Sequence, residues 1–301
     1  RRSQRGSLDL ESTEAKIQIG EDGRVQDIVP RQSGVSEGMI EEFMLVANEA
    51  AASFGLAREL PFLFRIHEDP SAEKLEALAE LLKVLGLDTV QIKPGVQPSE
   101  LQAVLKAVKG TDMQMLVNSQ LLRSMAKARY SEVNKGHFGL VLQKYSHFTS
   151  PIRRYPDLAI HRIMSESLKG TAAQEMQRRF GRFVQDAAVH SSTAEQRAMS
   201  VERSCEDCYK AEYMNAHIGE EFQGTVVSAV EFGLFIALPD TCEGLLHTDN
   251  MPDGEYVCDD MVSLKNLTNG MEYRVGDPIR VKVINANVNS GKIDFALADE
   301  D

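Results

Sequence analysis

Short alternating runs open the chain and give way to a helical pattern. Residues 16–19 and 25–28 alternate apolar with polar side chains, and the Asp-Gly pair between them is a strong hairpin signal. From about 36 to 55 apolar residues recur with the helical period, which predicts a helix that ends at Gly55. The apolar residues that carry this period include Met39, Ile40 and Phe43.

The middle of the chain mixes predicted strands with predicted helices. Apolar runs at 61–67 and 136–142 are typical of short buried strands. Leucines at helical spacing, such as Leu75, Leu78 and Leu82, indicate a helix that faces a core. Helices are predicted over 72–86, 98–108, 113–128 and 172–217, with a further helix that begins near 150.

From Gly219 onward the pattern changes to short strands separated by turn residues. Five such runs in a segment of this length predict a small barrel. Within it, Phe232 and Phe235 are either core side chains, which the periodicity favours, or exposed platforms on which bases stack. The five runs are 222–230, 232–238, 243–247, 279–288 and 292–297.

Length and composition are consistent with two domains. The chain has 301 residues, enough for large cores, and its pattern predicts an α+β fold with a boundary between 217 and 218. No apolar run approaches the roughly 20 residues that span a bilayer, and the four cysteines follow no disulfide framework. We therefore expect a cytoplasmic protein without a membrane partner. Because the chain opens on RRSQRGSLDL and not on Met, we expect it to be an internal or C-terminal piece of a longer protein.

Charge is distributed unevenly along the chain. The net charge is −12, and residues 219–301 hold 5 Lys or Arg against 16 Asp or Glu. Residues 121–165, by contrast, hold 8 Lys or Arg against 2 acidic residues. A basic island in an acidic chain indicates a local anion site and not a diffuse basic surface.

The basic island contains a predicted helix start. Ser150 is a suitable N-cap and Pro151 would occupy the first helical position, so the free N–H groups of that turn would favour an anion. Arg153, Asp157 and His161 would then share one helix face, where Asp157 could hold a guanidinium. An arginine bound to phosphate and an arginine in a structural ion pair are both consistent with these residues.

Metal and nucleotide motifs are weak or missing in this sequence. His-Glu-Asp at 67–69 would alternate between the two faces of a strand, so these side chains cannot converge on one ion. Cys205-x-x-Cys208 lies in a charged helical segment far from the other two cysteines, which disfavours zinc. No Gly-rich phosphate loop, serine triad or HExxH helix occurs. We predict no metal ligands and no nucleotide cofactor within this chain.

Several long motifs, in order, resemble the ribonuclease II/ribonuclease R family, whose catalytic domain is known as RNB. GHFGL at 136–140 and YSHFTSPIRRYPDL at 145–158 carry most of the resemblance, and the fuller HFTSPIRRYPDL form favours the ribonuclease R branch. The segment 230–247 looks like an S1-type OB fold. The resemblance therefore implies the C-terminal portion of an RNB domain over 1–217 and a five-stranded OB-fold barrel over 218–301. Further segments similar to the family pattern are 5–12, 39–50, 61–70 and 121–130.

The resemblance implies processive 3′→5′ hydrolysis of single-stranded RNA to nucleoside 5′-monophosphates, with magnesium, by a monomer. At the matching positions, Arg153 would contact the scissile or an adjacent phosphate, and Glu195 would lie at the active site. One of Glu41 and Glu42 would reach the 3′-terminal nucleotide. The other implied RNA contacts are Arg154, Tyr145, His147, Tyr155, Phe232, Phe235 and His247.

Departures from the family pattern limit this expectation. The metal-binding aspartates of the family lie upstream of these motifs, and nothing in this chain matches them, so the Mg²⁺ ligands are expected upstream and the chain alone is expected to be inactive. Leu10 stands where relatives commonly carry an aromatic residue. The alternative is an RNA-binding or scaffold protein with a degenerate nuclease domain. A third, weaker alternative is a structural fragment without affinity for RNA.

Overall fold

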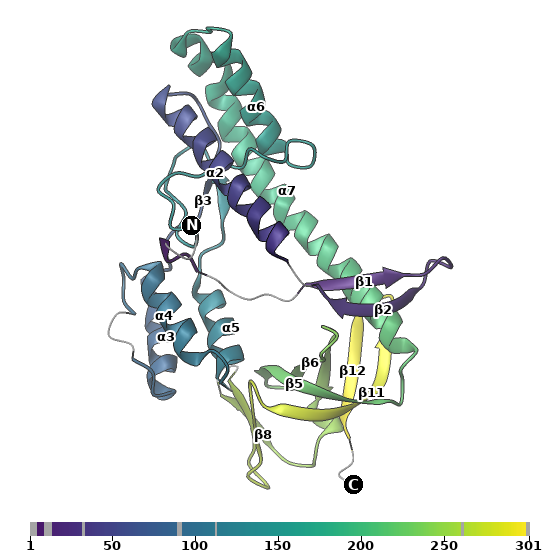
Figure 1. Ribbon diagram of the computed structural model, residues 1–301. Helices are drawn as coiled ribbons and strands as arrows, with labels where there is room; N and C mark the ends of the chain where they lie inside the picture. Colours follow the sequence, from purple (N-terminus) through teal and green to yellow (C-terminus); the bar gives the residue numbers. More distant parts are fainter. Residues whose placement is uncertain are drawn as a thin grey trace. The chain divides into compact units, whose positions relative to one another are not determined.

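The computed structural model describes residues 5–8, 14–31, 34–88, 92–111, 113–259 and 262–298 (Figure 1). They fall into two compact units: residues 1–10, 33–107 and 120–198 form one, and residues 11–32, 108–119 and 199–301 form the other. Mixed helices and strands make up the first unit, and a closed five-stranded barrel dominates the second. The predicted α+β class with a barrel is confirmed. Leu10 lies outside the described residues.

Helix α2 (Val35–Ala57) extends beyond its predicted end at Gly55. Its first turn is closed by the Glu37 carboxylate, which accepts a hydrogen bond of 3.1 Å from the Gly34 N–H. Gly55 is buried, and a Cβ at this position would lie 2.6 Å from the Phe62 ring. The glycine therefore permits close packing and does not end the helix.

The apolar residues that indicated α2 do not form its buried face. Met39, Ile40 and Phe43 are each more than half exposed, whereas the buried residues of the helix are Asn48, Ala51, Ala52 and Gly55. Small residues let the backbone of α2 approach its neighbours closely, and this contact decides which face is buried. The apolar period correctly predicted a helix but could not identify its packed side.

The core of the first unit lies around a short sheet and two long helices. Strand β3 (Phe64–Ile66) pairs antiparallel with β4 (Arg129–Ser131), so only part of the predicted strand 61–67 is extended and paired. Helix α6 (Tyr155–Leu168) runs beside the first part of α7 (Ala173–Asn215) (Figure 1). The buried cluster that joins these elements includes Phe62, Phe64, Ile66, Tyr130, Ile160, Ile163, Met176, Phe180 and Val184.

Two further sequence predictions concern the connecting segments. The predicted strand at 136–142 is wrong, because His137 and Leu142 bond to each other through both backbone amides and close a tight turn. Val141 takes a φ of 53° inside this turn. The predicted helices at 72–86, 98–108 and 113–128 are confirmed as α3 (Ala72–Val84), α4 (Pro98–Val108) and α5 (Gln114–Ser124).

The second unit contains a hairpin and the barrel. Strands β1 (Ala15–Ile19) and β2 (Val25–Pro30) form the predicted antiparallel hairpin. The barrel order is β11-β12-β7-β6-β5, and the parallel pairing of β7 with β12 closes it. Its fully buried side chains include Leu234, Val281 and Phe295. The strands are β5 (Glu221–Val230), β6 (Gly233–Ala237), β7 (Glu243–His247), β11 (Pro278–Asn287) and β12 (Lys292–Leu297).

A second sheet between β7 and β11 was not predicted. A 3-10 turn (Thr248–Asn250) leads into β8 (Tyr256–Asp259), β9 (Ser263–Asn266) and β10 (Glu272–Arg274), which pair in sequence order. These strands are short and largely polar, so they lack the apolar alternation that marks a strand in sequence. The buried Asn266 side chain organises the preceding loop by donating to the carbonyls of Pro252 and Asp253.

Candidate functional site

An open pocket of about 420 Å³ lies in the first unit, where the start of α6 faces the middle of α7. Four of the predicted site residues line it: the consecutive Arg153, Arg154 and Tyr155, and Glu195 from α7. The remaining lining residues are Tyr130, Pro156, His190, Ser191, Ala194 and Ala198. Two arginines beside an aromatic ring make this pocket suitable for a phosphate with an organic group attached.

The helix at the pocket does not begin where the sequence predicted. Its N-cap is Arg154, with an extended backbone at φ −122° and ψ 116°, and Pro156 occupies its first turn. Ser150 and Pro151 precede the helix in a turn, which the Arg154 N–H closes by donating to the Ser150 carbonyl at 3.0 Å. The prediction of Ser150 as N-cap was wrong because Pro156 is also compatible with a helix start.

Asp157 holds a guanidinium, but not that of Arg153. The Asp157 side chain is fully buried, and its Oδ1 accepts hydrogen bonds of 2.8 Å from both the Ser150 N–H and Arg154 Nη2. Arg153 lies before the helix, so it does not share a helix face with Asp157 and His161 as predicted. It is exposed and forms no ion pair within the described part of the chain. The structural ion pair is thus made by Arg154, which leaves Arg153 available to an anion.

Glu195 is held by an arginine that sequence reasoning missed. Arg65 Nη1 lies 2.6 Å from Glu195 Oε2, and the two side chains are only 14% and 25% exposed. The Arg65 guanidinium also lies 4.7 Å from the centre of the Tyr130 ring, in cation–π contact. Arg65 stands in the family-like segment PFLFRIHEDP, but nothing local to that segment indicates a partner on α7.

A buried network of aromatic and imidazole rings supports Tyr130 from behind. The Tyr130 hydroxyl lies 2.9 Å from His147 Nδ1, and His147 contacts Tyr145 edge-on, with ring centres 5.7 Å apart. Asn48 donates to the Tyr145 hydroxyl at 3.1 Å. Tyr145 and His147 therefore do not line the pocket. Their geometry favours a supporting role over the predicted contact with RNA.

Burial keeps this network uncharged at neutral pH. Burial, reinforced by nearby Arg154 and Arg65, lowers the pKa of His147 to about 2. Burial and the neighbouring His67 lower the pKa of His137 to about 3, and burial raises the pKa of Tyr130 to about 12. His147 is therefore neutral at pH 7, and the Tyr130 hydroxyl keeps its proton and can donate it to Nδ1.

Glu41 and Glu42 both lie on α2 and are not among the residues that line the pocket. Glu41 is exposed and Glu42 is half-buried. Which of them reaches a terminal nucleotide stays a prediction.

Two of the three predicted RNA contacts of the second unit, Phe232 and His247, lie at one end of the β6–β7 hairpin. Phe232 is 50% exposed and its ring stacks on His247 with centres 6.2 Å apart. Phe235 is half-buried on β6, opposite Leu245. The interpretation of Phe232 as a core residue was wrong, because it falls in the turn before β6 and Leu234 and Ile236 fill the barrel instead.

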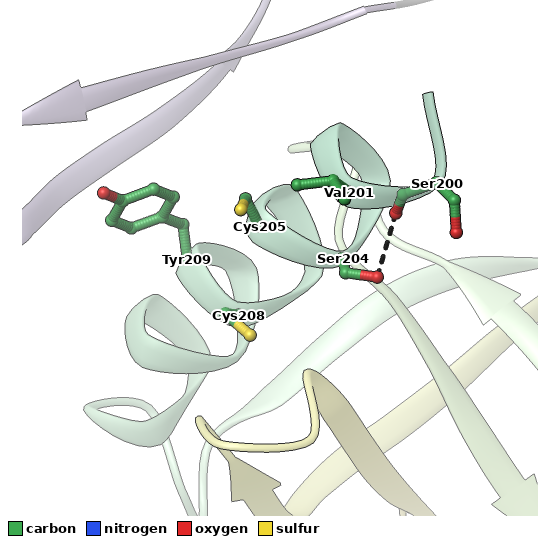
Figure 2. Close-up of a pocket in the computed structure, with 6 residues that line it drawn as sticks. All are labelled: Ser200, Val201, Ser204, Cys205, Cys208 and Tyr209. Carbon is green, nitrogen blue, oxygen red and sulfur yellow. Dashed lines mark hydrogen bonds between the residues drawn. The ribbon is translucent and has the colours of Figure 1, made fainter. Parts of the chain in front are cut away.

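No group of three or more His, Cys, Asp or Glu side chains within the described residues could hold a metal ion. The chain's described residues therefore do not fit a magnesium site by themselves. Cys205 and Cys208 line an open pocket on α7, and Figure 2 shows their sulfur atoms pointing in different directions. Among the described helices none is long and apolar enough to cross a membrane.

Comparison with known proteins assigns the chain to a family. The RNB domain matches residues 1–170, and the S1 RNA binding domain matches residues 216–298. The chain belongs to the RNB family. The match ends before most of α7, so the predicted boundary between 217 and 218 stays a prediction.

The similar relatives are RNB proteins named ribonuclease R, which confirms the branch that the motifs favoured. Ribonuclease R 1 of Lactococcus lactis is 41% identical over 296 residues, which are 98% of this chain and 36% of that protein. Ribonuclease R of Thermotoga maritima is 39% identical over 304 residues, covering 100% of this chain and 43% of that protein. The chain thus spans about two-fifths of the length of these curated relatives.

A solved RNB structure shares the fold of this chain. The structure of Mycoplasma genitalium RNase R in complex with ribose-methylated single-stranded RNA matches with a TM-score of 0.89 and 27% identity. The match covers 99% of this chain and 47% of that chain.

Proposed function

We propose that the complete protein containing this sequence is a processive 3′→5′ exoribonuclease that hydrolyses single-stranded RNA to nucleoside 5′-monophosphates. The observation that carries the proposal is the pocket that Arg153 and Glu195 both line, in a chain whose relatives are named ribonuclease R. Arg153 is exposed at this pocket, so its guanidinium can bind a phosphodiester through paired, charge-assisted hydrogen bonds.

The other predicted residues act around that contact. Arg154 is oriented by Asp157 and contributes positive charge from the pocket wall. Glu195 is oriented by Arg65, at the side of the pocket formed by α7. In the second unit, the stacked Phe232 and His247 rings offer a surface on which bases of single-stranded RNA can stack.

We propose that the magnesium ligands of the complete protein are residues outside this chain. Hydrolysis of a phosphodiester by this family of enzymes needs carboxylates that hold the ion, and the described residues offer no such cluster. We therefore propose that this chain alone binds RNA but does not hydrolyse it. We further propose that the complete protein works as a cytoplasmic monomer, and light scattering of the purified complete protein tests its oligomeric state.

The direct test compares the 301-residue chain with the complete protein on a 3′-labelled single-stranded oligoribonucleotide with magnesium. The complete protein is expected to release labelled mononucleotide and the chain alone is not. Efficient release by the chain alone would show that the essential ligands are within it. Binding without hydrolysis by the complete protein would instead favour the alternative, an RNA-binding protein with a degenerate nuclease domain.

The role of Arg153 is tested by Arg153→Ala, with Arg162→Ala as the matched control. Arg162 is exposed, belongs to the same basic island and does not line the pocket. Loss of one phosphate contact is expected to reduce the salt dependence of RNA binding by about one unit of slope. In the complete protein, Arg153→Ala is expected to slow single-turnover hydrolysis more than it weakens binding. An unchanged single-turnover rate would contradict the phosphate role.

A further inference from the structure

The peptide groups of Phe148 are held from two sides, shortly before the turn that presents Arg153. The Phe148 N–H donates to Asn48 Oδ1 at 2.9 Å, and the Phe148 carbonyl lies 2.9 Å from His161 Nε2. We propose that Asn48 and His161 are positioning residues, which fix Phe148 and through it the place of Arg153 in the pocket. The inference rests on the proposed function, because it needs Arg153 to bind a phosphate.

Asn48 is bonded through both polar atoms of its side chain. It is 3% exposed and lies on α2, 100 residues before Phe148 in the sequence. Its Nδ2 donates to the Tyr145 hydroxyl at 3.1 Å, while its Oδ1 accepts from the Phe148 N–H. One buried amide therefore bonds to two points of the segment 145–148. This segment can shift only if a buried polar group loses its partner, which is costly.

His161 holds the opposite side of Phe148 from α6. Because a carbonyl oxygen only accepts hydrogen bonds, Nε2 carries the proton in this contact. The imidazole ring also stacks on the Phe148 ring, with ring centres 4.3 Å apart and planes inclined by 13°. The N-cap of α6 is Arg154, the residue after Arg153. The helix that holds Phe148 therefore also fixes the end of the turn.

The backbone between Phe148 and Arg153 transmits this constraint. The Ser150 N–H donates to the buried Asp157, and the Arg153 N–H donates to the Ser150 carbonyl at 3.3 Å. Since Ser150 is anchored only two residues after Phe148, a displaced Phe148 would pull on the turn that Ser150 closes. A guanidinium binds a phosphate through paired hydrogen bonds of defined geometry, so a shift of about 1 Å would weaken this contact.

The test measures binding of a single-stranded oligoribonucleotide to the 301-residue chain by fluorescence anisotropy over a range of salt concentrations. Asn48→Leu keeps the size of the side chain but cannot accept from Phe148. It is expected to weaken binding by about 2- to 10-fold. Asn48 is not among the residues that line the pocket. The salt dependence should nevertheless fall by up to about one unit of slope, as for Arg153→Ala, because the same phosphate contact is lost.

A double variant separates positioning from a general loss of structure. If Asn48 acts through Arg153, the chain with both Asn48→Leu and Arg153→Ala should bind no more weakly than Arg153→Ala alone. Its salt dependence should also equal that of Arg153→Ala. Additive losses of binding would overturn the positioning role. All variants are compared at a temperature at which circular dichroism shows them to be folded.

Two milder variants test the two sides of Phe148 separately and decide the question if Asn48→Leu does not fold. Asn48→Asp keeps an oxygen that accepts from the Phe148 N–H, so it is expected to retain the salt dependence of the unmodified chain. His161→Phe keeps a ring that can stack on Phe148 but removes the donor to its carbonyl, so its salt dependence should fall. The opposite pattern, with a loss for Asn48→Asp and none for His161→Phe, would overturn the proposal.

Asn266→Leu is the matched control. Asn266 is also a buried asparagine that organises neighbouring backbone, but it belongs to the second unit. The variant is expected to lower stability and to leave the salt dependence of RNA binding unchanged. A fall in slope equal to that of Asn48→Leu would overturn the positioning role, because the slope would then report destabilisation in general.

The outcomes distinguish this inference from the proposed function. If Arg153→Ala lowers the salt dependence while Asn48→Leu and His161→Phe do not, the positioning role fails and the proposed function stands. If Arg153→Ala itself leaves the salt dependence unchanged, or if the unmodified chain does not bind the oligoribonucleotide, the phosphate role of Arg153 fails and the positioning role fails with it.

Discussion

Arg153 and Arg154 are adjacent in sequence and both line the pocket, but only the Arg154 guanidinium is bound to a buried partner. Arg154 extends into the buried region, where Asp157 fixes its guanidinium at 2.8 Å. Arg153 stays in the open pocket, exposed and without an ion pair among the described residues. The same residue type therefore has a structural role at Arg154 and is available to a ligand at Arg153. The difference comes from burial, because a buried charge must be paired whereas an exposed one need not be.

The same contrast separates the buried ring network from the pocket surface. Behind Tyr130, the side chains of His147, Tyr145 and Asn48 satisfy one another through hydrogen bonds or edge-on contacts. In the pocket, Tyr155 is exposed and the Ser191 hydroxyl has no partner among the described residues. Changes in the buried region should therefore affect stability first, and changes in the pocket should affect binding first.

The largest effect is expected from Asp157→Ala. This change removes a buried acceptor and leaves the Ser150 N–H and the Arg154 guanidinium without it. Breaking a buried ion pair in this way costs about 3–5 kcal/mol of unfolding free energy. Urea denaturation measures the loss, and Asp157→Asn, which keeps an acceptor oxygen, should lose less. A loss for Asp157→Ala below about 1 kcal/mol would contradict the structural role of this pair.

Acid should destabilise the buried region next. The pKa values of His147 and His137 are lowered on folding to about 2 and about 3, so the unfolded chain binds protons that the folded chain does not. The stability contributed by the neutral rings is fully present above the unfolded pKa, near 6.5. This stability is lost as pH falls towards the pKa values of the folded state, by up to about 1.4 kcal/mol per pH unit for each histidine. Urea denaturation between pH 7.5 and pH 4.5 measures this slope.

His147→Gln is the control for the acid effect. Glutamine can still accept from Tyr130 but does not titrate, so the variant should lose part of the pH dependence. An unchanged slope would show that His147 is not the group responsible.

A smaller effect is expected at the contact between Arg65 and Glu195, which joins the two regions. A double-mutant cycle of Arg65→Ala and Glu195→Ala should give a coupling free energy of about 1–3 kcal/mol, since the pair is close and mostly buried. Arg65→Lys should recover only part of it, because lysine cannot reproduce the planar contact with Tyr130. A coupling free energy near zero would show that Glu195 does not depend on Arg65 for its position.

The smallest effect on stability is expected on the exposed side. Phe232→Ala removes a half-exposed ring outside the barrel core and should change the unfolding free energy by no more than about 0.5 kcal/mol. The same variant should weaken binding of single-stranded RNA by about 1–3 kcal/mol if Phe232 stacks on a base. Leu234→Ala, in the barrel core, is the opposite control and should lose stability. A large stability loss for Phe232→Ala would show that its main role is in packing.

The sequence by itself predicted most of the helices and strands, and it contains the motifs that indicate the family. The helical period over 36–55, the Asp-Gly hairpin and the five barrel strands all depend on local patterns, and the structure contains them. The family motifs also selected Arg153 and Glu195, which the fold brings into one pocket. Local pattern is sufficient here because a period in the side chains selects the backbone conformation of its own segment.

Only the tertiary structure decided which surfaces and charges are used. The exposure of Phe43 on α2 depends on which elements pack against that helix, and the choice between Arg153 and Arg154 depends on where α6 begins. Arg65 and Glu195 are separated by 130 residues, so no local period connects them. Burial, ion pairing and the shape of a pocket arise between segments that are distant in sequence, and for this reason they became visible only when the chain was folded.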